Sequence, residues 1–384
     1  MSDLPQIHWT EDGVEHSALW RSEAGLPPPR RVVIADDTTT ADTAYRLACE
    51  GTALLWRGDF QNARQLLQAM ARRTERKPKK ATRPGKKAKA EAPASPTEAF
   101  HLHRLAQSQR ARTLGMLLLP FGADHSVPLR RAPDVREACE QVYGAASEPY
   151  VASMRELLGM IGAYEWRKKG VEIPALEDRI HPWYGVFSPV RGEYVDLVAA
   201  EPLPSKALAF DIGTGTGVLA ALLAKRGVKR VVATDQDPRA LASARENIDR
   251  LGYAAQVEII DADLFPAGRA PLVVCNPPWV PARPSSPVER AVYDPDSIML
   301  RGFLEGLAAH LEPGGEGWLL LSDLAEHLGL RPREQLMGWI EAAGLKVLGR
   351  SDIRARHPRA TDIEDPLHAA RSAEVTTLWR LGAR

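Results

Sequence analysis

The sequence predicts an α/β protein in which residues 181–384 form a doubly wound parallel sheet of seven strands. Two observations predict this class. Short β-rich runs alternate with helical segments from residue 180 onward, which is the pattern of strands joined by crossover helices. A turn with glycines at 213, 215 and 217 follows the first of these runs and precedes a helix. A mostly helical α/β region is expected ahead of the sheet.

The individual elements of the sheet follow from apolar runs and from signals at helix ends. Pro238 stands in the first turn of one helix and Gly252 follows its end, as proline and glycine commonly do. Another helix is ended by Pro313-Gly-Gly315. The expected strands are 207–211, 230–235, 256–262, 272–275, 318–322, 345–349 and 374–381, and the expected helices are 218–226, 238–251, 298–311 and 333–343.

The first 180 residues are organised differently. A short buried strand is expected at 31–36, followed by helical spacing of apolar residues over 41–73 that is interrupted near Gly58. Residues 72–96 are rich in Lys, Ala and Pro, and we interpret them as a flexible linker because they have too little apolar surface to become ordered. The predicted divisions are an N-terminal α/β region at 1–71, the linker at 72–96, a helical region at 97–180 and the sheet domain at 181–384.

Composition excludes several classes of protein. The chain has 384 residues, 44% of them hydrophobic and 26% charged, as in ordinary globular proteins. It has no apolar run of about eighteen residues and no basic segment followed by an apolar one at its start, so neither a spanning helix nor a secretory signal is expected. The three cysteines are scattered and form no CxxC pair, which predicts a cytoplasmic protein. No membrane association is expected, since no spanning helix is. No metal is expected, since His101, His103 and His125 lack a supporting cysteine or acidic cluster.

The glycine-rich turn reads Asp211-Ile-Gly213-Thr-Gly215-Thr-Gly217. It lacks the Gly-Lys-Ser/Thr ending of a phosphate-binding loop, and its third glycine comes one residue earlier than in a dinucleotide-binding loop. The turn resembles motif I of class I S-adenosylmethionine-dependent methyltransferases. The resemblance implies that Gly213, Thr214, Gly215 and Gly217 bring the backbone close to the methionine part of S-adenosylmethionine, and that Asp211 faces the amino-acid end of the cofactor. A tight turn without a ligand is the alternative.

Acidic residues at the ends of the next two strands are candidates for binding the rest of the cofactor. Asp235 ends the second strand, and an acid about twenty residues past the glycines can accept hydrogen bonds from both ribose hydroxyls. Asp237 precedes Pro238 and is better interpreted as the N-cap of the following helix. The family resemblance places a carboxylate near the adenine amino group after the third strand, where we favour Asp263 over Asp261.

The run Leu272-Val-Val-Cys-Asn276-Pro-Pro-Trp279 resembles motif IV of amino-group N-methyltransferases, an Asn, Asp or Ser followed by two prolines and an aromatic residue. A planar amino nitrogen is a poor nucleophile because its lone pair is delocalised. The Asn276 side-chain oxygen and the Pro277 carbonyl can accept its two hydrogens and direct the lone pair toward the methyl group. Pro277 and Pro278 fix φ and hold these groups rigidly, and Trp279 can stack on the acceptor. A proline turn with a core tryptophan is the alternative.

Two related families bear on the identity of the methyl acceptor. The segment Tyr184-Gly-Val-Phe187-Ser-Pro189 resembles the Gly-Val-Phe-Ser segment of the small-domain ribosomal-RNA guanine-N2 methyltransferases, and the resemblance implies that Phe187 contacts the acceptor together with Trp279. HemK-type enzymes methylate glutamine in peptide-release factors. When residues 187–193 are set without gaps against the entry segment of those enzymes, only Glu193 falls in register. Those enzymes also carry a glycine-rich run further along the chain, and this sequence has residues 293–298 in its place, which counts against a glutamine acceptor.

Charge favours a nucleic acid as the partner. Residues 72–89 hold ten Lys or Arg and one Glu, a local charge of +9 in a chain whose net charge is +1. Such a segment can neutralise phosphates, and Arg354, Arg356, His357 and Arg359 form a second basic run. We therefore expect methylation of an exocyclic amine of an RNA base, in rRNA or a ribosomal particle. The alternatives are a protein glutamine, a small molecule, and a cofactor-binding partner subunit without activity of its own.

Overall fold

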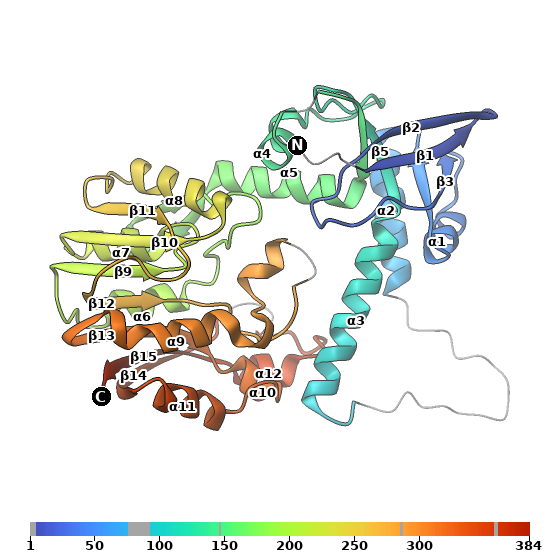
Figure 1. The fold of residues 1–384 in the computed structure, drawn as a ribbon. Coiled ribbons are helices and arrows are strands. Elements are labelled where there is room, and N and C mark those ends of the chain that lie inside the picture. The colour runs from blue at the N-terminus through green and yellow to red at the C-terminus, as the bar shows by residue number, and fades with distance from the viewer. Residues whose placement is uncertain (1–4, 76–92, 146, 285–286, 357–359) are drawn as a thin grey trace. The chain divides into compact units, whose positions relative to one another are not determined.

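The computed structural model describes residues 5–75, 93–145, 147–284, 287–356 and 360–384. These residues form two compact units (Figure 1). The first takes its residues from 1–92 and 102–165, and the second from 93–101 and 166–384. The long helix α3 (Pro96–Leu114) therefore contributes to both units. No helix of the described part of the chain is long and apolar enough to cross a lipid bilayer.

The second unit is built on a seven-stranded sheet of order β11-β10-β9-β12-β13-β15-β14. The five strands from β11 to β13 run parallel, whereas β15 is antiparallel to both of its neighbours. The prediction of a seven-stranded doubly wound α/β sheet is confirmed, but the sheet is mostly rather than wholly parallel, because β15 runs antiparallel where a parallel strand was expected. The strands are β9 (Leu208–Ile212), β10 (Arg230–Asp235), β11 (Val257–Asp261), β12 (Ala270–Cys275), β13 (Leu311–Ser322), β14 (Leu345–Arg354) and β15 (Val375–Ala383).

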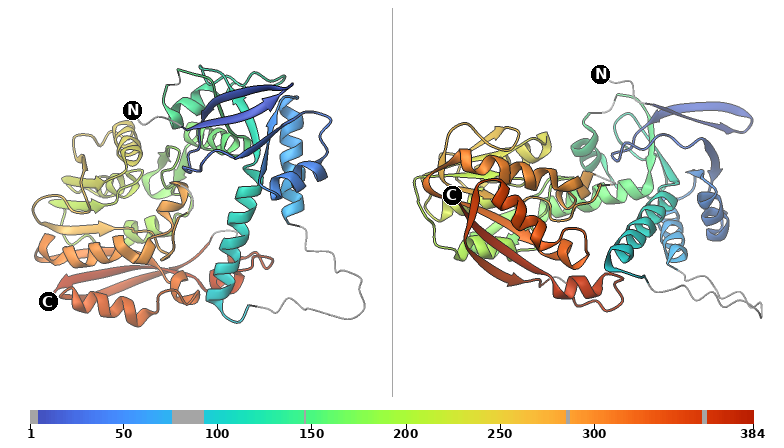
Figure 2. Two further views of the ribbon diagram at one scale, coloured as in Figure 1. Left: turned by 45° about the vertical axis from the view of Figure 1, so that its right-hand side comes forward. Right: turned by 60° about the horizontal axis from the view of Figure 1, so that its bottom comes forward.

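Helices cover both faces of this sheet (Figure 2). Successive side chains of a strand point to opposite faces, so Ala209 of β9 joins one hydrophobic core while Phe210 and Ile212 join the other. The first core is completed by α6, α7 and α8, and the second by α9 and α11. The bounds of these helices are Glu193–Ala200 for α6, Val218–Lys225 for α7, Pro238–Arg250 for α8, Ile298–His310 for α9 and Arg333–Ala342 for α11.

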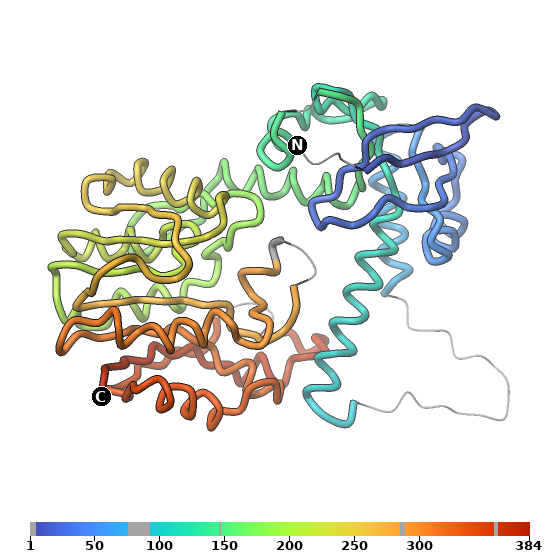
Figure 3. The backbone as a smooth tube through the Cα atoms, viewed as in Figure 1, coloured from blue at the N-terminus to red at the C-terminus, as the bar shows by residue number. Residues whose placement is uncertain are grey.

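The first unit contains a six-stranded mixed sheet of order β1-β2-β6-β5-β4-β3, whose path can be followed in Figure 3. The strands β3, β4 and β5 are parallel, and β6 is antiparallel to β5. The strands are β1 (Gln6–Glu11), β2 (Val14–Trp20), β3 (Arg31–Ala35), β4 (Thr52–Trp56), β5 (Leu117–Phe121) and β6 (Tyr150–Ser153), and the helices are α1 (Ala41–Cys49), α2 (Phe60–Thr74), α4 (Arg136–Tyr143) and α5 (Met154–Lys169).

Several strands of the N-terminal half differ from the prediction. The strand β4 interrupts the stretch 41–73, where only helical spacing was expected. The predicted helical region 97–180 also contains β5, β6 and the short pair β7 (Val171–Ile173) and β8 (Asp178–Ile180). All five residues of β4 are buried, so its sequence lacks the alternation that marks a half-exposed strand. Most of the predicted linker, residues 76–92, lies outside the described residues.

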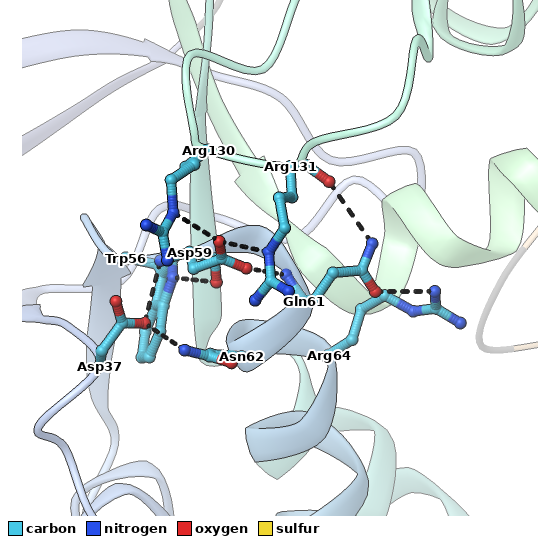
Figure 4. Close-up of polar contacts among 8 residues, drawn as sticks. All are labelled: Asp37, Trp56, Asp59, Gln61, Asn62, Arg64, Arg130 and Arg131. Atoms are coloured by element: carbon cyan, nitrogen blue, oxygen red, sulfur yellow. Dashed lines mark hydrogen bonds and ion pairs between the residues drawn. The ribbon is translucent and has the colours of Figure 1, made fainter.

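A buried carboxylate fixes the start of α2 (Figure 4). Asp59 caps the helix by accepting a hydrogen bond from the Gln61 N–H at 2.8 Å. Its other oxygen accepts from Nε of Arg130 at 3.0 Å and Nε of Arg131 at 2.7 Å. The hydrogen bond from Arg131 holds the pKa of Asp59 well below its usual range, so this buried group stays charged and paired.

Candidate active site

A cavity of about 300 Å³ opens at the carboxyl ends of β9, β10 and β12 in the second unit. This is the edge at which open α/β sheets bind ligands, because the loops that follow parallel strands meet there. The cavity brings together most of the residues that the sequence predicts for the cofactor and for the methyl acceptor. Those that line it are Phe187, Asp211, Gly213, Thr214, Gly215, Asp235, Asn276, Pro277, Pro278 and Trp279.

The glycine-rich turn is held in place by hydrogen bonds to β9, β10 and α7. Asp211, at 1% exposure, accepts hydrogen bonds from the Thr214 hydroxyl at 2.6 Å and the Ala220 N–H at 3.1 Å. The Thr214 N–H donates to the Thr234 carbonyl at 2.8 Å, and the Gly215 N–H donates to Asp235 at 3.0 Å. The turn is therefore fixed by hydrogen bonds of the protein itself, and Asp211 and Asp235 are part of its scaffold.

The three glycines of the turn are needed for different reasons. All have positive φ, a conformation that other residues adopt only with strain. A Cβ on Gly213 would collide with the Met299 side chain, and one on Gly217 would lie 3.3 Å from Ala244 of α8. Nothing lies within 4 Å of the Cβ position of Gly215, because that position faces the open cavity. Gly215 therefore leaves room for a ligand, whereas Gly217 serves the packing of α7 against α8 and does not line the cavity.

The buried Asp211 and the half-buried Asp235 favour a positively charged ligand in the cavity. Burial raises the pKa of Asp211 to about 6 and also raises the pKa of Asp235. A positively charged ligand would offset this burial cost. The Asp235 carboxylate accepts hydrogen bonds from the Gly215 and Asp237 N–H groups, at 3.0 Å each, and a carboxylate has about four acceptor sites, so a ligand hydroxyl can bind there as well. These groups fit S-adenosylmethionine, which carries an ammonium, a sulfonium and two ribose hydroxyls.

The acidic residues predicted at the end of the third strand, Asp261 and Asp263, lie outside the cavity lining. Asp263 is exposed, contacts the Gln236 side chain and does not line the cavity, and Asp261 is likewise exposed and absent from its lining. Leu264 has a positive φ of 63°, and its carbonyl accepts a hydrogen bond from the Thr234 hydroxyl, so the chain turns sharply after Asp263. Asp263 thus lies outside the cavity lining, and its contact with the adenine stays a prediction. The interpretation of Asp237 as an N-cap is confirmed, since it accepts from the Arg239 N–H at 2.8 Å.

The acceptor loop Asn276–Trp279 follows β12 directly. The indole N–H of Trp279 donates to Oδ1 of Asn276 at 2.9 Å, so the tryptophan orients the carboxamide that motif IV requires. One lone pair of this oxygen remains for a ligand hydrogen. The indole is half-buried, packs against the cores of both sheet faces, and carries the Arg191 guanidinium 5.3 Å from its ring centroid. Trp279 is thus both a wall of the cavity and a support for Asn276.

Other lining residues were not predicted. Arg191, Tyr194 and Met299 line the cavity, as does the exposed Arg290. Arg191 is held by Glu374, whose carboxylate accepts from Nη2 at 2.9 Å. It lies only two residues beyond the predicted segment 184–189, so extending that segment would have included it. Met299 reaches the site from the first turn of α9, which no sequence pattern connects with the glycine-rich turn.

The histidines of the N-terminal half have local roles. His125 is buried, and its ring nitrogens contact the Tyr150 hydroxyl at 3.0 Å and the Gly144 carbonyl at 2.8 Å. The exposed His101 ring lies edge-on to Phe100. Over the residues that the structure describes, no group of three His, Cys, Asp or Glu side chains is placed to hold a metal ion.

Comparison with known proteins agrees with this geometry. Residues 179–332 match the family model of the methyltransferase small domain. The release factor glutamine methyltransferase of Cereibacter sphaeroides is 35% identical over 165 residues, covering 39% of this chain and 56% of that protein. A tRNA1(Val) (adenine(37)-N6)-methyltransferase of Bacteroides fragilis is 31% identical over 158 residues, covering 37% of this chain and 66% of that protein. The ribosomal protein L11 methyltransferase of Pelotomaculum thermopropionicum is 35% identical over 146 residues, covering 37% of this chain and 39% of that protein.

The similarity to these three relatives is confined to part of each chain, and this chain spans between 39% and 66% of their lengths. The matched segment contains the glycine-rich turn, Asp235 and the acceptor loop, which are the features that meet in the cavity. Residues 179–332 of this chain are therefore similar to the methyltransferase small domain, and they include strands β9 to β13 of the seven-stranded sheet.

Proposed function

We propose that this protein transfers a methyl group from S-adenosylmethionine to a planar amino nitrogen. One observation carries the proposal. A single cavity is lined by the Gly213–Gly215 turn with Asp211 and Asp235, and also by Asn276-Pro-Pro-Trp279. A cofactor-binding partner subunit without activity would have no need to keep the acceptor loop beside the cofactor turn.

The roles of the residues follow from their positions. The bound cofactor supplies an electrophilic methyl group on a positively charged sulfur. Asp211 and Asp235 bind its cationic and hydroxyl groups, and Gly215 leaves space for it. The remaining lone pair of Asn276 Oδ1 and the Pro277 carbonyl accept the two hydrogens of the acceptor nitrogen. The nitrogen lone pair would then point toward the methyl group, which is catalysis by orientation. The new N–C bond would form as the S–C bond breaks, the sulfur would leave as a neutral thioether, and the nitrogen would lose one proton to solvent.

The acceptor that we propose is an exocyclic amine of an RNA base. Arg191, whose guanidinium lies over the Trp279 ring, and Arg290 also line the cavity, and cationic side chains suit a base flanked by phosphates. A tRNA adenine methyltransferase is among the relatives. A protein glutamine is the second candidate, because a release factor glutamine methyltransferase is also among them.

Transfer of labelled methyl into an extract of cells that lack the enzyme separates the two acceptors. We expect the label to enter a macromolecular fraction, to be released by nuclease and to resist protease. Release by protease alone would establish the glutamine candidate instead. Absence of any transfer would contradict the proposed activity. As a second test, deletion of residues 76–90, which hold eight Lys or Arg, should weaken RNA binding and flatten its salt dependence.

A further inference from the structure

A buried arginine lies behind the acceptor loop, outside the cavity itself. Arg331 is 2% exposed and does not line the cavity. Its Nη2 donates to the Trp279 carbonyl at 3.1 Å, and its Nη1 donates to the Ser297 hydroxyl at 3.2 Å. One guanidinium therefore joins the acceptor loop to the start of α9, and a planar head with several donors is needed to reach both.

The start of α9 is itself tied to both loops of the site. Asp294 accepts hydrogen bonds from the Met299 and Leu300 N–H groups, each at 3.1 Å, and so caps the helix. Its own N–H donates to the carbonyl of Val280, the residue after the acceptor loop, at 2.9 Å. Met299, in the first turn, packs over Gly213 of the cofactor turn. Movement at Ser297 would therefore reach the acceptor loop through Val280, whereas the cofactor turn keeps its own hydrogen bonds to Asp211 and Asp235.

Backbone conformation at this point requires support. Asp296 and Ser297 both have positive φ, 55° and 54°, in a region that residues other than glycine occupy at a cost. Ser297 is 1% exposed, and its hydroxyl accepts the hydrogen bond from Arg331. Burial lowers the pKa of Arg331, and the charges of Glu326 and Asp294 oppose this effect. A charged group is thus kept in the interior where it contacts the acceptor loop.

We propose that Arg331 is a positioning residue for methyl transfer. It fixes the Trp279 carbonyl, and the Trp279 indole in turn orients Asn276 through its N–H. Because Arg331 contacts the backbone of the acceptor loop rather than a ligand, its removal should lower turnover more than it weakens cofactor binding. This inference rests on the proposed function only for its activity readout, since the order of the loop can be measured without an acceptor.

The test compares Arg331→Met with Arg331→Lys and with a matched control, Arg333→Met. Arg333 lies two residues away, is half-buried, and pairs with Glu326 without contacting the acceptor loop. Hydrogen exchange of peptides covering 276–284 and 287–294 reports loop order. Calorimetry with S-adenosylhomocysteine reports the cofactor site, and labelled methyl transfer into extract RNA reports turnover.

We expect Arg331→Met to accelerate exchange in both peptides and to lower kcat by roughly 10- to 100-fold, with cofactor affinity changed by less than about 3-fold. Arg331→Lys should be intermediate, because one ammonium cannot replace the planar fork. Exchange and kcat equal to those of Arg333→Met would overturn the proposal. If Arg331→Met does not fold, Ser297→Ala removes one anchor and should loosen the same peptides; unchanged exchange there would also overturn it. Failure of the wild-type protein to transfer methyl would instead refute the proposed function and leave the exchange result standing.

Discussion

Replacing Asp211 by Asn should make the protein more stable at neutral pH while weakening its cofactor site. Burial raises the pKa of Asp211 from 3.8 to about 6 in the folded protein. The folded state therefore binds more protons than the unfolded state between these values, and stability falls as pH rises from about 4 to about 6. The raised pKa corresponds to roughly 3 kcal/mol of folding free energy, which is fully present below about pH 4 and lost above about pH 6.

The assay is thermal unfolding of Asp211→Asn and wild type at several pH values between 4 and 7.5. The stability of the variant relative to wild type should increase by roughly 3 kcal/mol across this range, which is about 6–12 °C in Tm for a unit of this size. Asp261→Asn, which alters an exposed carboxylate outside the cavity, is the control and should show no such trend. A pH-independent difference between Asp211→Asn and wild type would refute the view that Asp211 is held at an electrostatic cost.

Three further changes test other parts of the site. Trp279→Phe removes the indole N–H that orients Asn276. The loss of about one hydrogen bond should lower kcat by roughly 5- to 10-fold without loss of cofactor affinity. An unchanged kcat would show that the tryptophan does not orient Asn276. Gly215→Arg fills the cavity and should abolish S-adenosylhomocysteine binding measured by calorimetry, whereas Gly252→Arg, at another positive-φ glycine outside the cavity, should retain it. Equal binding by these two glycine variants would mean that the cofactor binds elsewhere. Asp235→Ala should also weaken this binding, because it removes the proposed ribose acceptor and the hydrogen bond to the Gly215 N–H; binding as tight as in the wild type would remove Asp235 from the site.

The sheet of the second unit was predictable because local patterns and global topology agree there. β10 occupies 230–235 as predicted, and α8 begins at Pro238 behind its Asp237 cap. The start of α8 is signalled by residues that favour helix ends, namely the N-cap Asp237 and the proline that follows it. The meeting of Asp211, Asp235 and Asn276 follows from the rule that parallel strands present their carboxyl ends at one edge.

The missed features depend on contacts between distant residues. The strand β4 is buried throughout and only five residues long, so its sequence shows no alternation. Asp263 was assigned from its place after the third strand, whereas its contact with the Gln236 side chain outside the cavity lining follows from no pattern in the sequence. Arg331 is separated from Trp279 by 52 positions, and no pattern in the sequence pairs them.

Asn276→Ala tests the central claim most directly, since it removes one side chain of the acceptor loop and none of the cofactor turn. Cofactor affinity, measured by calorimetry with S-adenosylhomocysteine, should stay within about 3-fold of wild type, while labelled methyl transfer should fall by at least roughly 100-fold. Intact binding with lost turnover would show that the loop acts on the acceptor nitrogen. Methyl transfer at the wild-type rate would contradict the claim that this cavity performs N-methylation through Asn276.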